Sequence, residues 1–177
     1  MSSPDPEWIF LGTLIVLLLA FHRARRAFWL FSVLVLPGTF AHEGSHFLLG
    51  LVLGGQPASV TLIPHREGQG WVLGSVTFQN LRWYNVFFIG LAPLLLLPAA
   101  YRLALWRLEA GPVLGWREAL ALYGIANLIY ACVPSWHDLR MAARSPIGWL
   151  MLAGGLGGWF WFQGRSVPQG APGQVAR

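Results

Sequence analysis

The sequence predicts an all-α polytopic membrane protein, a bundle of about five transmembrane helices with a membrane-associated β-hairpin between the second and third. Of its 177 residues, 55% are hydrophobic and only 11% are charged. This composition is far too apolar for an ordinary soluble domain of this length. Apolar residues are also gathered into separate segments, at 8–21, 27–53, 83–105, 113–133 and 147–162.

The three middle segments are long enough to cross a bilayer, whereas the first and last are short. A helix needs about 20 residues to span about 30 Å of hydrocarbon. Segments 8–21 and 147–162 must therefore recruit flanking residues, thin the bilayer or lie partly in its interface. Acids precede the first segment and arginines follow it, opposite to the charge order of a secretory signal, so we interpret it as a retained membrane segment. We expect one integral membrane domain over 1–162 and a disordered Gly- and Pro-rich tail over 163–177.

Residues 58–78 have a different pattern from the apolar segments. Two runs that favour strands flank a turn-like stretch, His65-Arg66-Glu67-Gly68-Gln69-Gly70, and this order predicts a β-hairpin. A two-stranded ribbon has unpaired backbone groups along its edges. The hairpin could therefore bind an extended substrate peptide along one edge, or it could simply connect two helices and pack against them.

The charged residues indicate lipid as a partner. All 12 basic residues are arginine, and the net charge of +5 is dispersed among short connections. Without a continuous basic stripe, nucleic acid is not expected as a partner. Arginines beside apolar spans suit phospholipid head groups, and several of the 10 Trp lie near the ends of spans, as interfacial belts require.

A metal-binding pattern lies within segment 27–53, in the run His42-Glu43-Gly44-Ser45-His46. Helical residues four apart return to nearly the same face, so His42 and His46 can bind one ion while Glu43 lies beside its open position. Ionisable groups inside a bilayer cost about 2.5–3.5 kcal/mol each when charged. A bound metal would offset that cost.

Catalytic zinc usually takes three protein ligands and leaves a fourth position for water. The sequence contains only two Asp residues, and Asp138 follows an apolar segment and the helix-breaking Pro134. Its carboxylate could therefore fold back toward the bundle as the third ligand. The neighbouring His137 is the alternative third ligand, or an interfacial group.

In this order of motifs the chain resembles the site-2 protease family of intramembrane zinc metalloproteases, over roughly 27–141. The resemblance rests on the His42 to His46 motif, the hairpin, Gly90-Leu91-Ala92-Pro93, and Asn127 followed by Pro134 and Asp138. The family's aspartate is commonly followed by glycine, whereas here Leu139 follows Asp138.

The resemblance implies a zinc-dependent intramembrane endopeptidase that holds one Zn²⁺ and cuts a transmembrane protein or peptide. Glu43 would be the general base, and Asn127 and the hairpin 58–78 would hold substrate. The location would be a multi-pass position in a bacterial-type inner membrane. Across five spans, eight arginines lie on the side that holds the loop after the first segment, and four lie on the side of the N-terminus, the hairpin and the Asp138 loop. The arginine excess predicts that the first of these sides is cytoplasmic and the N-terminus outside. Resemblance to bacterial family members suggests the opposite, and orientation stays open. A noncatalytic metal-bound scaffold and a divalent-metal transporter are the alternative functions. Oligomeric state does not follow from the sequence.

Overall fold

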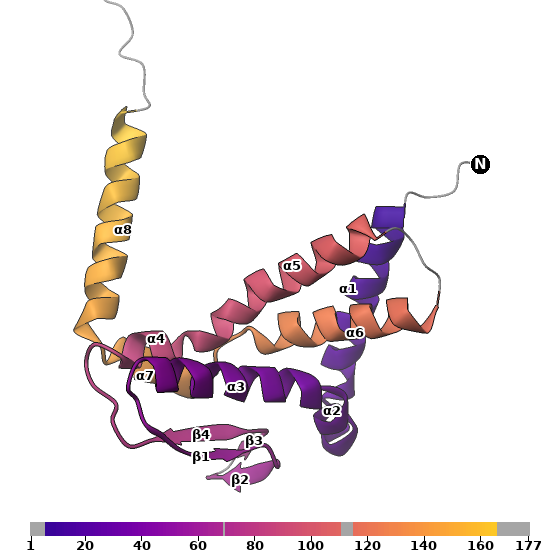
Figure 1. Ribbon diagram of the computed structural model, residues 1–177, viewed down its shortest axis with the longest axis horizontal. Coiled ribbons are helices and arrows are strands. Elements are labelled where there is room, and N and C mark those ends of the chain that lie inside the picture. Colours follow the sequence, from indigo (N-terminus) through magenta and orange to yellow (C-terminus); the bar gives the residue numbers. More distant parts are fainter. Residues whose placement is uncertain (1–5, 69, 111–114, 166–177) are drawn as a thin grey trace, which may run out of the picture.

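The protein, described by a computed structural model over residues 6–68, 70–110 and 115–165, is mostly helical with a small β-segment (Figure 1). This confirms the predicted helical class in its coarser form. The helices are α1 Pro6–Ala24, α2 Phe28–Leu34, α3 Leu36–Val52, α4 Val86–Gly90, the 3-10 helix η1 Ala92–Leu95, α5 Leu96–Glu109, α6 Trp116–Ala131, α7 Trp136–Ala143 and α8 Pro146–Arg165. The strands are β1 Pro57–Thr61, β2 His65–Glu67, β3 Gly70–Val72 and β4 Ser75–Phe78.

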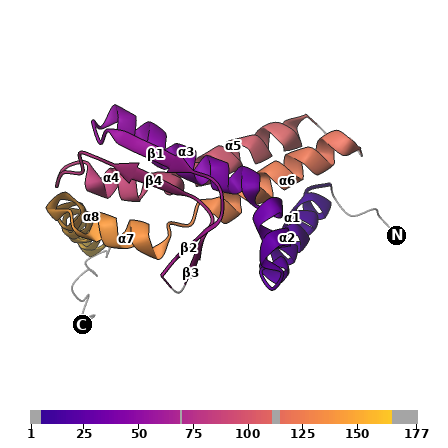
Figure 2. The ribbon, with the colours of Figure 1, turned by 90° about the horizontal axis from the view of Figure 1, so that it is seen from below.

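The hairpin predicted over 58–78 is present as two consecutive antiparallel ladders. Strand β1 pairs with β4, with Val60 opposite Val76, and β2 pairs with β3, with Arg66 opposite Trp71. Residue 69 lies outside the described residues. The β1 and β4 strands run along α3 and contact it, so the hairpin covers one side of that helix (Figures 1 and 2).

Two of the apolar segments predicted as continuous helices, 27–53 and 83–105, are broken in the structure. Segment 27–53 divides at Val35 into α2 and α3, and Pro37 occupies the first turn of α3. Segment 83–105 divides into α4, η1 and α5, with Pro93 in the first turn of η1. Proline has no backbone N–H and fits only the first turn of a helix, so each of these two prolines marks a new helix start.

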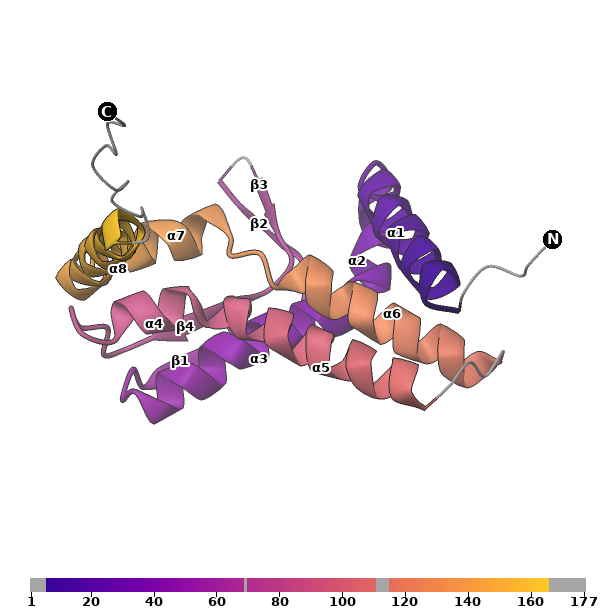
Figure 3. The ribbon, with the colours of Figure 1, turned by 90° about the horizontal axis from the view of Figure 1, so that it is seen from above.

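Helix α6 is central to the helical layer. It contacts α1, α3 and α5, and α3, α5 and α6 run side by side (Figure 3). Ile125 and Ala126 of α6 are fully buried, and they belong to the same apolar cluster as Phe21 of α1 and Phe31 of α2. A smaller cluster of Val86, Ile89 and Met141 joins α4 to α7.

Within the described residues, one helix is long and apolar enough by itself to cross a bilayer, namely 7–24 of α1. Helices α6 and α7, bent by 48° at their break, would together give a second. The arrangement of about five spans therefore stays a prediction. Residues 113–114 of segment 113–133 lie outside the described part, as do 166–177 of the predicted tail, whereas 163–165 continue α8.

Candidate metal centre

His42 and His46 lie on the face of α3 that is turned toward α4 and α7. Their side chains are 15% and 5% exposed, and the two Nε2 atoms are 3.3 Å apart. This closeness follows from the four-residue spacing on a regular helix. The sequence therefore determines the pair locally, without help from the rest of the fold.

A backbone carbonyl fixes the orientation of each imidazole. His42 Nδ1 lies 2.7 Å from the carbonyl oxygen of Ala131, and His46 Nδ1 lies 2.7 Å from that of Ile89. A carbonyl oxygen can only accept, so each Nδ1 carries a proton and donates it. In the neutral rings, both Nε2 atoms then present lone pairs, which is the tautomer a metal ligand needs.

Helix breaks make both of these carbonyls available. In a continuing α-helix, Ile89 would accept from the residue four positions on, but that residue is Pro93 and has no N–H. For Ala131 the corresponding residue is Ser135, whose N–H donates instead to Asp138 Oδ2, at 2.7 Å. The prolines that shorten the apolar segments thus leave acceptors for the histidines.

Asp138 is held by the first turn of α7. Its backbone N–H donates to Ser135 Oγ, at 3.2 Å, while its carboxylate accepts from the Ser135 N–H. This reciprocal pair is a capping box with Asp at the third helical position. The same contacts that start the helix after Pro134 therefore aim the Asp138 carboxylate at α3.

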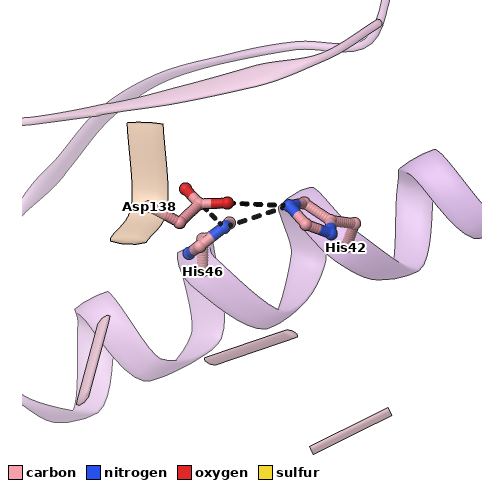
Figure 4. A group of neighbouring side chains, drawn as sticks. All are labelled: His42, His46 and Asp138. Atoms are coloured by element: carbon pink, nitrogen blue, oxygen red, sulfur yellow. Dashed lines mark hydrogen bonds and ion pairs between the residues drawn. The ribbon is translucent and has the colours of Figure 1, made fainter. Parts of the chain in front are cut away.

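The three side chains converge (Figure 4). Asp138 Oδ2 lies 3.4 Å from His42 Nε2, and Asp138 Oδ1 lies 3.3 Å from His46 Nε2. Two lone pairs and a carboxylate meeting in a buried place repel one another unless a metal ion lies between them or one imidazole is protonated. Within the described residues this is the one group of at least three His, Cys, Asp or Glu side chains that could hold a metal ion.

Glu43 is buried beside this group, at 7% exposure. The turn between β3 and β4 covers it closely, because a Cβ added to Gly74 would lie 2.7 Å from Glu43 Cγ and 3.0 Å from Thr39 Cγ2. The hairpin therefore packs against the predicted base, and Gly74 is the residue that allows this close approach.

The other predicted site residues lie elsewhere. His137, the alternative ligand, is exposed and lines a pocket with Arg82 and Arg140. Asn127 is 2% exposed, and its amide is used within the bundle: Oδ1 accepts from the Gly38 N–H at 3.0 Å and Nδ2 donates to the Tyr123 carbonyl at 3.0 Å. The role of Asn127 in holding substrate stays a prediction.

Two further residues, Ser135 and Gly90, support the site. Ser135 is the capping residue, and the pattern Ser-x-x-Asp directly after a proline is the signal that could have shown it. Gly90 lies against α7, since an added Cβ would be 2.7 Å from the Asp138 carbonyl oxygen. Its lack of a side chain lets α7 approach α4 at the position of Asp138.

No protein-family model, curated protein or solved structure matches this chain. Its own geometry therefore carries the functional interpretation.

Proposed function

We propose that the protein is a zinc-dependent intramembrane endopeptidase of the site-2 protease kind. The observation that carries the proposal is the convergence of His42, His46 and Asp138, with both Nδ1 atoms turned to backbone carbonyls. Glu43 lies buried beside this group, next to the hairpin. A structural cation site alone would not need a buried carboxylate that is not a ligand.

The kind of donor groups and the spacing of the two imidazole nitrogens support zinc. Two ligand atoms bound to Zn²⁺ at about 2.0–2.1 Å in tetrahedral geometry are about 3.3–3.4 Å apart. Octahedral Mg²⁺ at a similar bond length would bring neighbouring ligands to about 2.9 Å. The two Nε2 atoms are 3.3 Å apart, and each lies 3.3 or 3.4 Å from a different oxygen of the Asp138 carboxylate. Two imidazoles with one carboxylate are a donor set found in catalytic zinc sites.

A bound zinc ion would lower the pKa of water toward about 7 and polarise the scissile carbonyl. The chain's own residues then move the proton. The Glu43 carboxylate takes it from the attacking water and gives it to the leaving amine. Burial of Glu43 beneath Gly74 restricts bulk water around the carboxylate, so the proton has few competing acceptors.

The hairpin is proposed to hold substrate as an added strand. An extended peptide exposes its carbonyls, whereas a helical substrate uses them in its own hydrogen bonds. Contacts between α3 and both β1 and β4 place the ribbon beside the helix that carries the catalytic residue. A peptide paired to the ribbon's edge would then pass close to Glu43.

Outward-facing apolar side chains support a membrane setting. Ile15, Val16 and Leu19 of α1 are 56%, 64% and 62% exposed, and Leu150 and Phe160 of α8 are 72% and 71% exposed. We propose a multi-pass arrangement of five segments, with α2–α3, α4–α5 and α6–α7 as bent spans. Accessibility of tags at both termini and at the tip of the hairpin tests this arrangement and its orientation.

Glu43→Gln in the purified full-length protein tests the proposed chemistry. The variant should keep one zinc per chain and lose cleavage, whereas His42→Ala should lose zinc as well. Cleavage is read by mass spectrometry of membrane peptides from cells that make each form, where new fragments should end within apolar spans. Equal fragments from Glu43→Gln and the unaltered protein would reject the peptidase.

The same comparison separates the alternatives. A noncatalytic scaffold would bind its partner equally well with Glu43→Gln and would produce no fragments. A transporter would take zinc into sealed vesicles, and His42→Ala would abolish that uptake.

A further inference from the structure

A pocket that does not include His42, His46 or Asp138 lies beside α7. It is a cavity of about 500 Å³ between the loop that precedes α4 and α7. Three arginines from these two elements line it. We call it the arginine pocket, and its lining residues are Leu81, Arg82, Trp83, Val86, His137, Arg140, Met141 and Arg144.

The loop side of the arginine pocket is held in place by buried polar groups. Asn85 is fully buried, and its Oδ1 accepts from the Arg82 N–H at 2.7 Å while Nδ2 donates to the carbonyls of Leu53 and Asn80, at 3.3 and 3.1 Å. Ser145 Oγ, also fully buried, donates to the Trp83 carbonyl at 2.6 Å. The pocket is therefore preformed, which lowers the entropy cost of binding.

The charges in the pocket have the same sign. Arg140 on α7 and Arg144, the C-cap residue of α7, are four residues apart, a spacing at which like charges repel, and Arg82 is on the facing loop. Within the described part of the chain none of the three forms an ion pair. Arg82 Nε donates to the neutral Asn80 Oδ1 at 2.8 Å, and Arg140 stacks over Trp136 at 5.2 Å.

Three guanidinium groups around one cavity provide donors that match a phosphate. Each presents planar N–H groups suited to bidentate bonds with phosphate oxygens, and a bound anion would relieve their repulsion. The cavity is large enough for a head group, since small-molecule pockets typically measure about 300–1,000 Å³.

The surroundings favour a lipid phosphate. Trp83 and Trp136 are 62% and 67% exposed next to the pocket, and Trp149, at 61%, is anchored by its Nε1–H to the Ala143 carbonyl. Indoles mixed with arginines are typical of the membrane interface. The apolar helix α8 also leaves the body from this end (Figure 1). We propose that the arginine pocket binds the phosphate of an anionic phospholipid. This proposal does not depend on the peptidase activity.

Calorimetric titration of the full-length protein in an uncharged detergent tests the proposal. The probes are short-chain phosphatidylglycerol, short-chain phosphatidylcholine and inorganic phosphate. Phosphatidylglycerol should bind most tightly. Arg140→Gln and Arg144→Gln should each weaken its binding about tenfold or more, as loss of a charged hydrogen bond implies. The matched control is Arg117→Gln, which removes the same charge from an arginine that also stacks on a tryptophan, Trp116, at 5.5 Å.

Three results would overturn the proposal. If phosphatidylcholine binds as tightly as phosphatidylglycerol, the pocket does not select an anionic head group. If inorganic phosphate binds as tightly as phosphatidylglycerol, the pocket is a phosphate site and not a lipid site. If Arg117→Gln weakens phosphatidylglycerol binding equally, the loss reflects net charge and not contacts in the pocket. Arg140→Lys and thermal unfolding of each variant distinguish a lost contact from a lost fold, because lysine should restore part of the binding.

Discussion

Gly74→Ala perturbs the contact between the hairpin and the proposed base. The new Cβ would lie 2.7 Å from Glu43 Cγ and 3.0 Å from Thr39 Cγ2, whereas carbon atoms pack best at about 3.5–4.0 Å. Either the hairpin or the Glu43 side chain must therefore move by up to about 1 Å. Overpacking of this size costs about 1–3 kcal/mol in the free energy of unfolding.

The displacement should also reduce cleavage. Misplacing a catalytic group by about 1 Å can lower the rate about 100-fold. Zinc stoichiometry should remain at one per chain, because the contacted atoms belong to Glu43 and Thr39 and not to the ligands. The assays are denaturant unfolding in detergent, zinc content, and fragment yield from membranes.

Gly44→Ala is the matched control. It adds the same methyl group within the histidine motif itself, where no heavy atom outside the local helix backbone lies within 4 Å. In a helix, alanine in place of glycine should stabilise by up to about 1 kcal/mol. If Gly74→Ala retains the stability and fragment yield of Gly44→Ala, the hairpin does not pack on Glu43 and our account of its role is wrong.

Three further changes test the supports of the site. Ser135→Ala removes the acceptor for the Asp138 N–H, so stability should fall by about 1 kcal/mol and zinc affinity about 10- to 100-fold; Ser135→Thr should restore both, and an unaltered zinc affinity would contradict the coupling. Removing zinc with a chelator should lower the free energy of unfolding by about 2.7 kcal/mol if the free metal had been at 100 times its Kd. The stability of His46→Ala should not respond to the chelator. A response in that variant would place the metal elsewhere. Asn127→Ala leaves the Gly38 N–H without its acceptor and should cost about 1–3 kcal/mol; a raised KM without this loss of stability would instead show that the amide holds substrate.

The histidine pair could be predicted from its spacing, whereas His137 stayed an alternative to Asp138 because that choice depends on where a helix begins. His42 and His46 share a face because of a spacing that any α-helix fixes. His137 and Asp138, by contrast, are neighbours that differ by about 100° around a helix. Which one faces α3 depends on the residue at which α7 begins, and the Ser135 cap sets that residue. Hydrophobic pattern does not contain this information.

The breaks in the apolar segments and the orientation of the two imidazoles have the same physical origin. An apolar segment indicates burial or lipid contact, and it predicts one long helix. It does not show where the backbone hydrogen bonding of that helix is interrupted. Pro93 withholds the N–H that Ile89 would otherwise receive, and His46 donates there instead. After Pro134, the Ser135 N–H donates to the Asp138 carboxylate, and the Ala131 carbonyl accepts from His42 Nδ1. An uninterrupted helix at either place would supply its own donor to these carbonyls, and the imidazole would have to compete for the lone pair that fixes its tautomer. The shortened helices are therefore the condition under which two neutral histidines and one carboxylate can face a common ion.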